Sequence, residues 1–321
     1  MKFNLFLPTG FGSDLSSFSD PVDAVERIIQ LARTAESVGF SEVWLPDHLQ
    51  TIPPSNGYLF EAWTLLTAVA RATTRIRVGQ LVTGNGYRNP ALQAKMASTL
   101  DVLSAGRLTF GIGAGWYQAD YDAFGYEFPG AGRRLRELRE AVQVIQSLWT
   151  DEVSNFTGEF YSLKNAYVQP KGVQTPRIPL MIAGGGEKVT LRIVAEFADV
   201  CNLMASPADI ERKLQILRKH AADVGRDVRS IKVSATTGAL ITDTDDAARA
   251  QLHPSMGAFY PGDFASYLLY GTPDTVRERV AAYEKAGVDE LVVGFHHSTD
   301  PEAIRTFAKT VGLRSDFLRR T

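Results

Sequence analysis

The residues best suited to handle a proton are Asp47 and His48, which follow the apolar segment Glu42–Pro46. Histidine titrates near neutral pH, and a neighbouring carboxylate tunes its proton affinity. We therefore predict that His48 acts as a general acid or base and that Asp47 orients it. The structural alternative is that Asp47 caps the following segment and His48 is hydrogen-bonded within a loop.

Gly184, Gly185 and Gly186 form a second chemically informative motif. Glycine allows backbone N–H groups to approach a phosphate closely, and a helix that begins near Lys188 would favour negative charge at this point. Lys188 or Arg192 could supply a positive charge. A tight turn needs only one glycine with positive φ, so three in succession predict a phosphate site, although the stretch lacks the spacing of a P-loop.

Small residues also occur at Gly111, Gly113, Ala114 and Gly115. Their spacing resembles a dinucleotide-binding fingerprint, but Trp116 occupies the position of its third glycine. We predict that these residues leave room for a flat ring to lie against the backbone. Close packing at the end of a strand explains them equally well.

The elements that must position these motifs follow from the hydrophobic pattern. Short apolar runs alternate along the chain with amphipathic helical windows, several of which begin with proline and are followed by glycine. The predicted strands are Phe3–Pro8, Glu42–Pro46, Ile76–Val82, Leu108–Gly113, Pro179–Ala183, Val200–Asn202, Ile231–Leu240 and Leu291–Phe295. The predicted helices are Pro21–Val38, Phe60–Ala72, Pro90–Ser104, Arg133–Trp149, Lys188–Glu196, Pro207–Val224, Pro273–Ala286 and Pro301–Val311.

Strict alternation of eight strands with eight helices predicts an α/β fold, a single (β/α)8 TIM barrel that spans residues 1–321. The strands are almost continuously apolar, as expected of parallel strands buried on both faces. A doubly wound open sheet is the alternative, but such a sheet carries its glycine fingerprint after the first strand. The first strand here ends in Leu7-Pro8-Thr9-Gly10, without that fingerprint.

Active sites of such barrels lie at the C-terminal ends of the strands. Asp47 and His48 follow the second predicted strand, and His296 and His297 follow the eighth. These four residues could instead bind one metal ion, as in barrel amidohydrolases. Those proteins usually carry a His-x-His motif on the first strand, which is missing here, so we predict no metal site and place His296 in a substrate pocket.

Two long connections follow the fourth and seventh predicted strands, at Trp116–Gly132 and Thr242–Gly271. Both are rich in aromatic residues, and loops over a barrel mouth can form an apolar pocket or a lid. We predict that Trp116, Tyr117 and Phe259 line the substrate pocket. A subunit interface or a satellite core would explain the same composition.

Composition limits the classes of partner. The net charge of −2 gives no reason to expect nucleic acid or an anionic membrane surface. Cys201 is the only cysteine, which suits a reducing cytoplasm. No signal peptide is recognisable, and no apolar run reaches the roughly 20 residues that span a bilayer. We therefore expect a cytoplasmic protein that acts on a small molecule.

Several segments together resemble the bacterial luciferase-like flavin and deazaflavin oxidoreductases. They are VWLPDH, LVTGNGYRNPALQAKMASTLDVLSAGRL, GIGAGWYQADYDAFGYEFP, IAGGG and GTPDTVRERVAAYEKAGVDELVV. The resemblance covers nearly the whole chain and is closest to the branch that uses coenzyme F420, an 8-hydroxy-5-deazaflavin. It implies a (β/α)8 barrel with an added region after strand seven, in agreement with the number of predicted elements.

The resemblance also implies where a cofactor would bind. The matching positions that would contact its ring are Leu81, Val82, Thr83, Gly84, Gly113 and Ala114. Family members often have a non-prolyl cis peptide in the third-strand part of this set. Gly184, Gly185 and Gly186 would hold the phosphate, and Asp47 and His48 match an Asp-His pair near the reacting face of the ring.

The activity implied by the resemblance is hydride transfer between coenzyme F420 and an apolar or aromatic organic substrate. One departure from the family pattern is Trp116, which stands where the sugar-phosphate dehydrogenases of the family carry a glutamate that serves as an acid. This departure argues against sugar-phosphate oxidation. No cysteine matches the reactive cysteine of the luciferase catalytic subunit, which argues against light emission.

Two other functions stay open at this point. An FMN-dependent monooxygenase of the same family would receive reduced flavin from a partner reductase and react it with oxygen. A non-enzymatic flavin-binding protein is more remote, because such relatives tend to lose strands and loops that this chain retains. In each case the family resemblance implies a homodimer.

Overall fold

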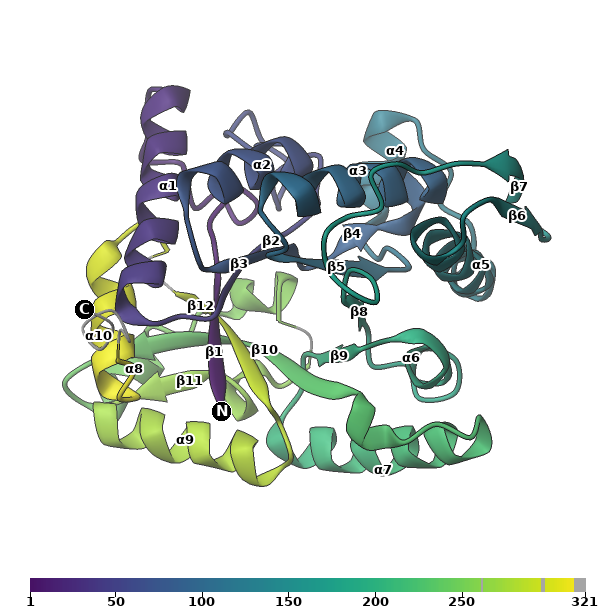
Figure 1. The fold of residues 1–321 in the computed structure, drawn as a ribbon. Helices are drawn as coiled ribbons and strands as arrows, with labels where there is room; N and C mark the ends of the chain where they lie inside the picture. Colours follow the sequence, from purple (N-terminus) through teal and green to yellow (C-terminus); the bar gives the residue numbers. More distant parts are fainter. Residues whose placement is uncertain (261, 296–297, 315–321) are drawn as a thin grey trace, which may run out of the picture.

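Eight parallel strands form a closed barrel at the centre of the molecule (Figure 1). The computed structural model describes residues 1–260, 262–295 and 298–314. The barrel strands are β1 (Lys2–Phe6), β2 (Glu42–Leu45), β3 (Arg77–Gln80), β5 (Leu108–Gly113), β8 (Leu180–Ala183), β9 (Val200–Leu203), β10 (Lys232–Ile241) and β12 (Glu290–Phe295). Strand β1 pairs with β12 and β2, and the pairing of β9 with β10 closes the sheet.

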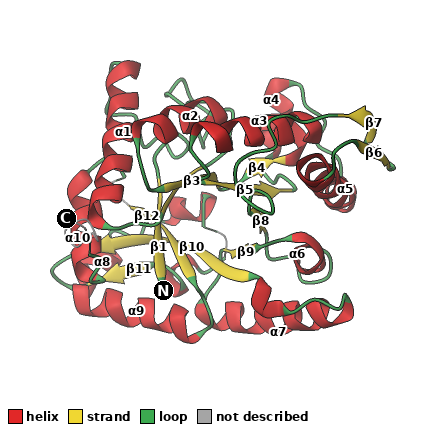
Figure 2. Ribbon diagram, viewed as in Figure 1, coloured by secondary structure: helices red, strands yellow, loops and turns green. Residues whose placement is uncertain are grey.

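Helices surround the strands on the outside of the barrel (Figure 2). They are α1 (Pro21–Val38), α2 (Ala62–Ala72), α3 (Pro90–Leu103), α5 (Ala131–Thr150), α6 (Thr190–Phe197), α7 (Pro207–Asp223), α9 (Pro273–Lys285) and α10 (Pro301–Thr310). The predicted (β/α)8 barrel is confirmed, and each predicted strand or helix boundary lies within two residues of the observed one. The starts of the helices follow from local chemistry: Asp20, Ser206 and Asp300 each cap a helix whose first turn contains proline.

Short elements occupy the longer connections. After β3 come β4 (Thr83–Gly84) and the 3-10 helix η1 (Asn85–Tyr87), and after β5 comes α4 (Gln118–Phe124). A separate hairpin of β6 (Ser154–Thr157) and β7 (Ser162–Ala166) precedes β8. The insertion after β10 contains α8 (Asp245–Ala250), η3 (Pro254–Ala258), η4 (Phe264–Ser266) and β11 (Leu269–Gly271), whereas η2 (Val228–Ser230) precedes β10. Both long connections predicted from the sequence therefore carry structure of their own.

The inside of the barrel is filled by a compact layer of large side chains. Trp44, Met181, Val200 and Val292 pack together there and are almost fully buried. Gly79 on β3 makes room for this layer, because a Cβ atom at that position would lie 2.4 Å from the indole ring of Trp44. Within the ranges that the structure describes, no helix has the length and apolarity needed to cross a membrane.

A buried polar cluster lies at the opposite end of the strands from the predicted site. Glu42 is only 4% exposed, and its carboxylate is 3.8 Å from Arg77 Nε. Burial raises the pKa of Glu42 to about 7, although the positive charge of Arg77 opposes this shift. The neighbouring Glu290 accepts a hydrogen bond from Asn4 Nδ2 at 3.2 Å. The base of the barrel therefore holds a carboxyl group that favours its protonated form.

This cluster makes stability depend on pH. Because folding raises the pKa of Glu42, the protonated carboxyl group contributes to the free energy of unfolding below pH 4.5. This contribution is lost as the pH rises to about 7. The lost free energy of unfolding is on the order of 3 kcal/mol. We expect Glu42→Gln to be more stable relative to the wild type at pH 7.5 than at pH 5, as measured by urea unfolding. A stability difference that is the same at both pH values would contradict this expectation.

Candidate active site

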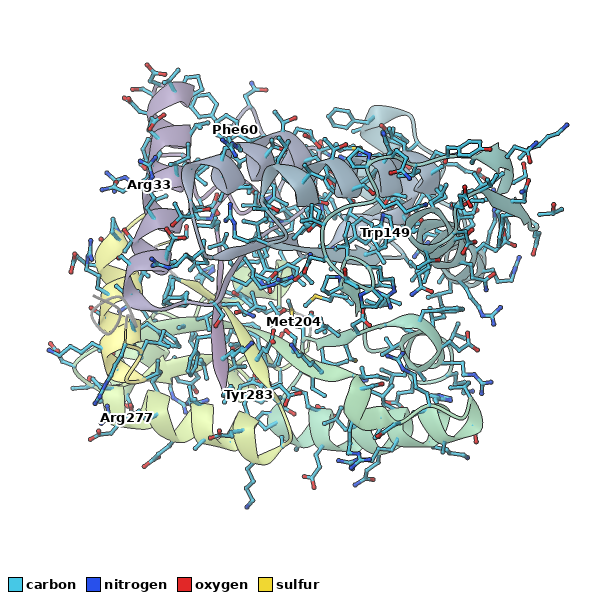
Figure 3. All side chains as sticks on the ribbon, in the orientation of Figure 1. Arg33, Phe60, Trp149, Met204, Arg277 and Tyr283 are labelled. Carbon is cyan, nitrogen blue, oxygen red and sulfur yellow. The ribbon has the colours of Figure 1, made fainter. Side chains whose placement is uncertain are left out.

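A large cavity opens at the C-terminal ends of the barrel strands and has a volume of about 1210 Å³. Met204, labelled near the middle of Figure 3, is one of the side chains that line it. The residues predicted from the sequence that line this cavity are Asp47, His48, Leu81, Val82, Thr83, Gly84, Gly113, Ala114, Trp116, Gly184, Gly185 and Phe259. Gly186 lines an adjoining shallow depression, and Tyr117 lies beside His48. His296 lies outside the described residues.

His48 is held by a carboxylate that the sequence did not reveal. Asp120 on α4 is fully buried, and its Oδ2 atom lies 2.7 Å from His48 Nδ1. The same oxygen accepts hydrogen bonds from the hydroxyl of Tyr87 at 3.0 Å and from the backbone N–H of Leu49 at 3.3 Å. Because a carboxylate accepts, Nδ1 of the ring donates, and Nε2 is the nitrogen left for a ligand.

The prediction that Asp47 orients His48 is wrong. Asp47 Oδ2 instead accepts hydrogen bonds from Arg88 Nη1 at 2.7 Å, Thr83 Oγ1 at 2.9 Å and the Gly84 N–H at 3.0 Å. Arg88 also reaches Glu61 at 2.8 Å. Asp47 therefore ties the end of β2 to the segment after β3 and does not cap the segment that follows it, so the structural alternative considered above is not observed for Asp47 either.

The segment between β3 and β4 approaches the end of β5 very closely. The peptide bond between Leu81 and Val82 is cis, as the family resemblance led us to expect. A Cβ atom on Gly111 would lie 2.1 Å from the carbonyl oxygen of Gln80, and one on Gly113 would lie 2.9 Å from Val82 Cγ2. Packing of these two segments against each other therefore requires the strand-end glycines.

The three-glycine turn after β8 adjoins Lys213, and the predicted Lys188 lines the same shallow depression as Gly185 and Gly186. Gly184 has φ +134°, a conformation that strongly favours glycine. Lys213 on α7 donates a hydrogen bond from Nζ to the carbonyl of Gly185 at 2.7 Å, and the same Nζ lies 3.5 Å from Glu187. Arg192 is instead paired with Glu196 at 3.1 Å. Lys213 and Lys188 are thus the cations beside this turn that could neutralise an anion.

Aromatic side chains enclose the imidazole of His48. Phe11 stacks on it with ring centroids 4.1 Å apart, and Trp116 and Tyr117 present edges at 5.7 and 5.8 Å. Phe259, from the insertion after β10, contacts Phe11 edge-on at 5.3 Å. The acid–base candidate therefore lies in apolar surroundings next to the cavity.

The charges around the cavity are few. Among its described lining residues there is no lysine or arginine, and the acidic ones are Asp14, Asp47 and Asp300. Burial raises the pKa of Asp14 to about 6, although a hydrogen bond from the Gly10 N–H opposes the shift. Asp47 is neutralised by Arg88. Apart from the three-glycine turn, these walls suit a neutral ligand better than an anionic one.

A parallel barrel with a cavity at the C-terminal strand ends defines a protein of the TIM-barrel class. Residues 1–267 match the family model described as luciferase-like monooxygenase, and the chain belongs to that family.

F420-dependent dehydrogenases and a monooxygenase are among the proteins that this chain resembles. An F420-dependent glucose-6-phosphate dehydrogenase of Amycolatopsis mediterranei is 33% identical over 193 residues, which cover 60% of this chain and 54% of that protein. The chain thus spans about half the length of this relative. An F420-dependent secondary alcohol dehydrogenase, solved with an F420-acetone adduct, has a TM-score of 0.81 at 22% identity, covering 97% of this chain and 98% of that one. Monooxygenase RslO1 from Streptomyces bottropensis has a TM-score of 0.79 at 20% identity, with coverage of 97% and 98%.

The contact between Asp120 and His48 can be tested by Asp120→Asn. The amide can offer an N–H group to Nδ1, so the ring loses the acceptor that fixes its tautomer and orientation. We expect kcat of the proposed hydride transfer to fall about tenfold or more, the size of one lost hydrogen bond to a charged group, while the dissociation constant of the cofactor stays unchanged. Asp122→Asn, an exposed change on the same helix, is the matched control and should leave kcat unaltered. Equal effects of the two substitutions would contradict the role of Asp120.

Proposed function

We propose that this protein is an oxidoreductase that transfers hydride between coenzyme F420 and an apolar or aromatic organic substrate. The observation that carries the proposal is the placement of His48, held by Asp120, beside a cavity flanked by the predicted ring and phosphate sites. Membership of the luciferase-like family and the F420-dependent relatives support the choice of reaction.

The shape of the cavity fits such a cofactor. Its volume of about 1210 Å³ exceeds the roughly 300–1,000 Å³ of an ordinary small-molecule site, so a tricyclic ring and a substrate have room together. Leu81, Val82, Thr83, Gly84, Gly113 and Ala114 would hold the ring. Gly184, Gly185 and Gly186 would hold the phosphate through backbone N–H groups, with Lys213 and Lys188 as nearby positive charges.

The residues around the cavity have separate tasks in this reaction. When bound, the deazaflavin supplies an obligate two-electron hydride carrier. His48 moves the accompanying proton at Nε2: it accepts the proton when an alcohol is oxidised and returns it when a carbonyl is reduced. The aromatic rings of Phe11, Trp116 and Tyr117 border the imidazole and give it apolar surroundings.

The cavity walls favour a neutral substrate. A phosphorylated sugar needs positive charge around a second phosphate site, away from the three-glycine turn, and the described lining residues supply no lysine or arginine. Trp116 also stands where a glutamate would serve the sugar-phosphate reaction. We therefore propose that the substrate is a neutral alcohol or carbonyl compound with an apolar body, rather than glucose 6-phosphate. From the family resemblance we also propose a homodimer as the functional assembly.

An FMN-dependent monooxygenase is the second candidate. The description of the matching family model and the shared fold with monooxygenase RslO1 favour it. In that case reduced FMN would come from a partner reductase and would react with oxygen. The aromatic walls would shield the site of this reaction from water. A non-enzymatic flavin-binding role is less consistent with the complete barrel and the ordered contact between Asp120 and His48.

Cofactor choice is the first measurement. The protein is titrated separately with F420 and with FMN, and binding is followed by cofactor fluorescence. We expect F420 to bind at least about tenfold more tightly, a difference of about 1.4 kcal/mol. Preference for FMN, with oxygen consumption in the presence of a reductase, would replace our proposal by the monooxygenase. If neither cofactor binds, both proposals fail.

The role of His48 is tested by His48→Ala. With saturating F420 and a responsive alcohol or ketone, we expect kcat to fall by about 10²–10⁴-fold, the usual contribution of general acid–base catalysis. The affinity for F420, measured by fluorescence, should change little because the proposed ring and phosphate contacts come from other residues. Unchanged turnover would exclude His48 as the proton-transfer group.

A further inference from the structure

Tyr260 occupies a slot formed by two glycines at the barrel mouth. Gly238 on β10 and Gly294 on β12 are paired directly in register. A Cβ atom on Gly238 would lie 2.8 Å from the hydroxyl oxygen of Tyr260, and one on Gly294 would lie 3.5 Å from it. The paired glycines therefore let the phenol, which comes from the insertion after β10, reach between two strands into the cavity wall.

The hydroxyl of Tyr260 differs from those of Tyr87 and Tyr283, which are bonded within the protein. It also differs from that of Tyr121, which has no partner among the described residues but does not line the cavity. Tyr87 donates to Asp120, and Tyr283 donates to the carbonyl of Tyr267 at 2.6 Å. The hydroxyl of Tyr260 makes no hydrogen bond within the described part of the chain, and Tyr260 lines the cavity. Burial raises the pKa of Tyr260 to about 12, so the phenol is neutral and able to donate. A half-buried donor without a protein partner is free to bind a polar atom in the cavity.

Apolar side chains line the cavity together with this hydroxyl and His48. Phe11 stacks on His48, and Phe259 contacts Phe11 edge-on. The lining therefore combines an imidazole, two phenyl rings and a phenol hydroxyl. A ligand that matches this lining has an apolar body and at least two polar atoms.

We propose that Tyr260 is a specificity-determining residue that donates a hydrogen bond to a second oxygen of the substrate, separate from the carbon that reacts near His48. This inference rests on the proposed function and narrows its substrate class. The substrate is a neutral alcohol or ketone with an apolar body and a further ether, carbonyl or hydroxyl oxygen.

The test uses aryl ketones of increasing length, made in matched pairs in which one terminal ether oxygen is replaced by CH2. 4′-Methoxyacetophenone and 4′-ethylacetophenone are the shortest pair. Binding is measured by calorimetry with the F420-loaded protein and again without F420. We expect the wild type to bind at least one ether about tenfold more tightly than its CH2 analogue, as for one hydrogen bond of about 1.4 kcal/mol.

Tyr260→Phe keeps the ring and removes only the hydroxyl, so it should abolish this preference without weakening the CH2 analogues. Gly238→Ala should have the same effect by displacing the phenol from its slot. Tyr167→Phe, which removes an exposed hydroxyl, is the matched control and should keep the preference. Thermal unfolding confirms that each variant is folded.

A wild type without any preference for the ethers would overturn the inference, and so would a preference that persists in Tyr260→Phe. Equal weakening of both members of a pair would show that Tyr260 only anchors the insertion, which also overturns it. Failure of the proposed function is separate, because it appears as absent F420 binding or absent turnover while ligand binding is still measured.

Discussion

The hydrogen bonds between β12 and β1 join the last barrel strand to the first, and the candidate site depends on the closed barrel that results. Residues far apart in the sequence, from Phe11 to Gly294, face one cavity only because the last strands return to the first. The large side chains inside the barrel support the same arrangement, since Trp44 needs the space left by Gly79. Each strand end thus contributes a small number of groups to a site that no single segment could build.

Two buried carboxylates at the mouth of the barrel have different roles. Asp47 meets the guanidinium of Arg88, which neutralises it and lets it fix the segment after β3. Asp120 meets an imidazole, a phenol and a backbone N–H, so its charge acts on the ring of His48. Asp47 precedes His48 directly in the chain but contacts Arg88 and the segment after β3 instead of the imidazole. The reason is that successive side chains at a strand end point to different sides.

The fold could be predicted from the sequence because apolar periodicity and helix boundaries are local. The strand ends also placed Asp47, His48 and the three glycines correctly at one face. Asp120, Phe11 and Lys213 were not found, and Tyr260 was only one of several aromatic residues in the loop after the seventh predicted strand, because their importance comes from contacts between distant segments. For Asp120, no sequence pattern links the carboxylate to His48, which lies in a distant part of the chain. For Tyr260, the signal lies in two glycines that become neighbours only when β10 and β12 pair.

The packed layer inside the barrel has a consequence for the order of events. Phe6, Leu81 and Val82 line the cavity and also pack against Trp44 and the other side chains of that layer. The floor of the cavity is therefore closed by packed side chains, and ligands enter and leave through its mouth. When one ligand lies on this floor beneath a second ligand, the lower one must bind first and be released last.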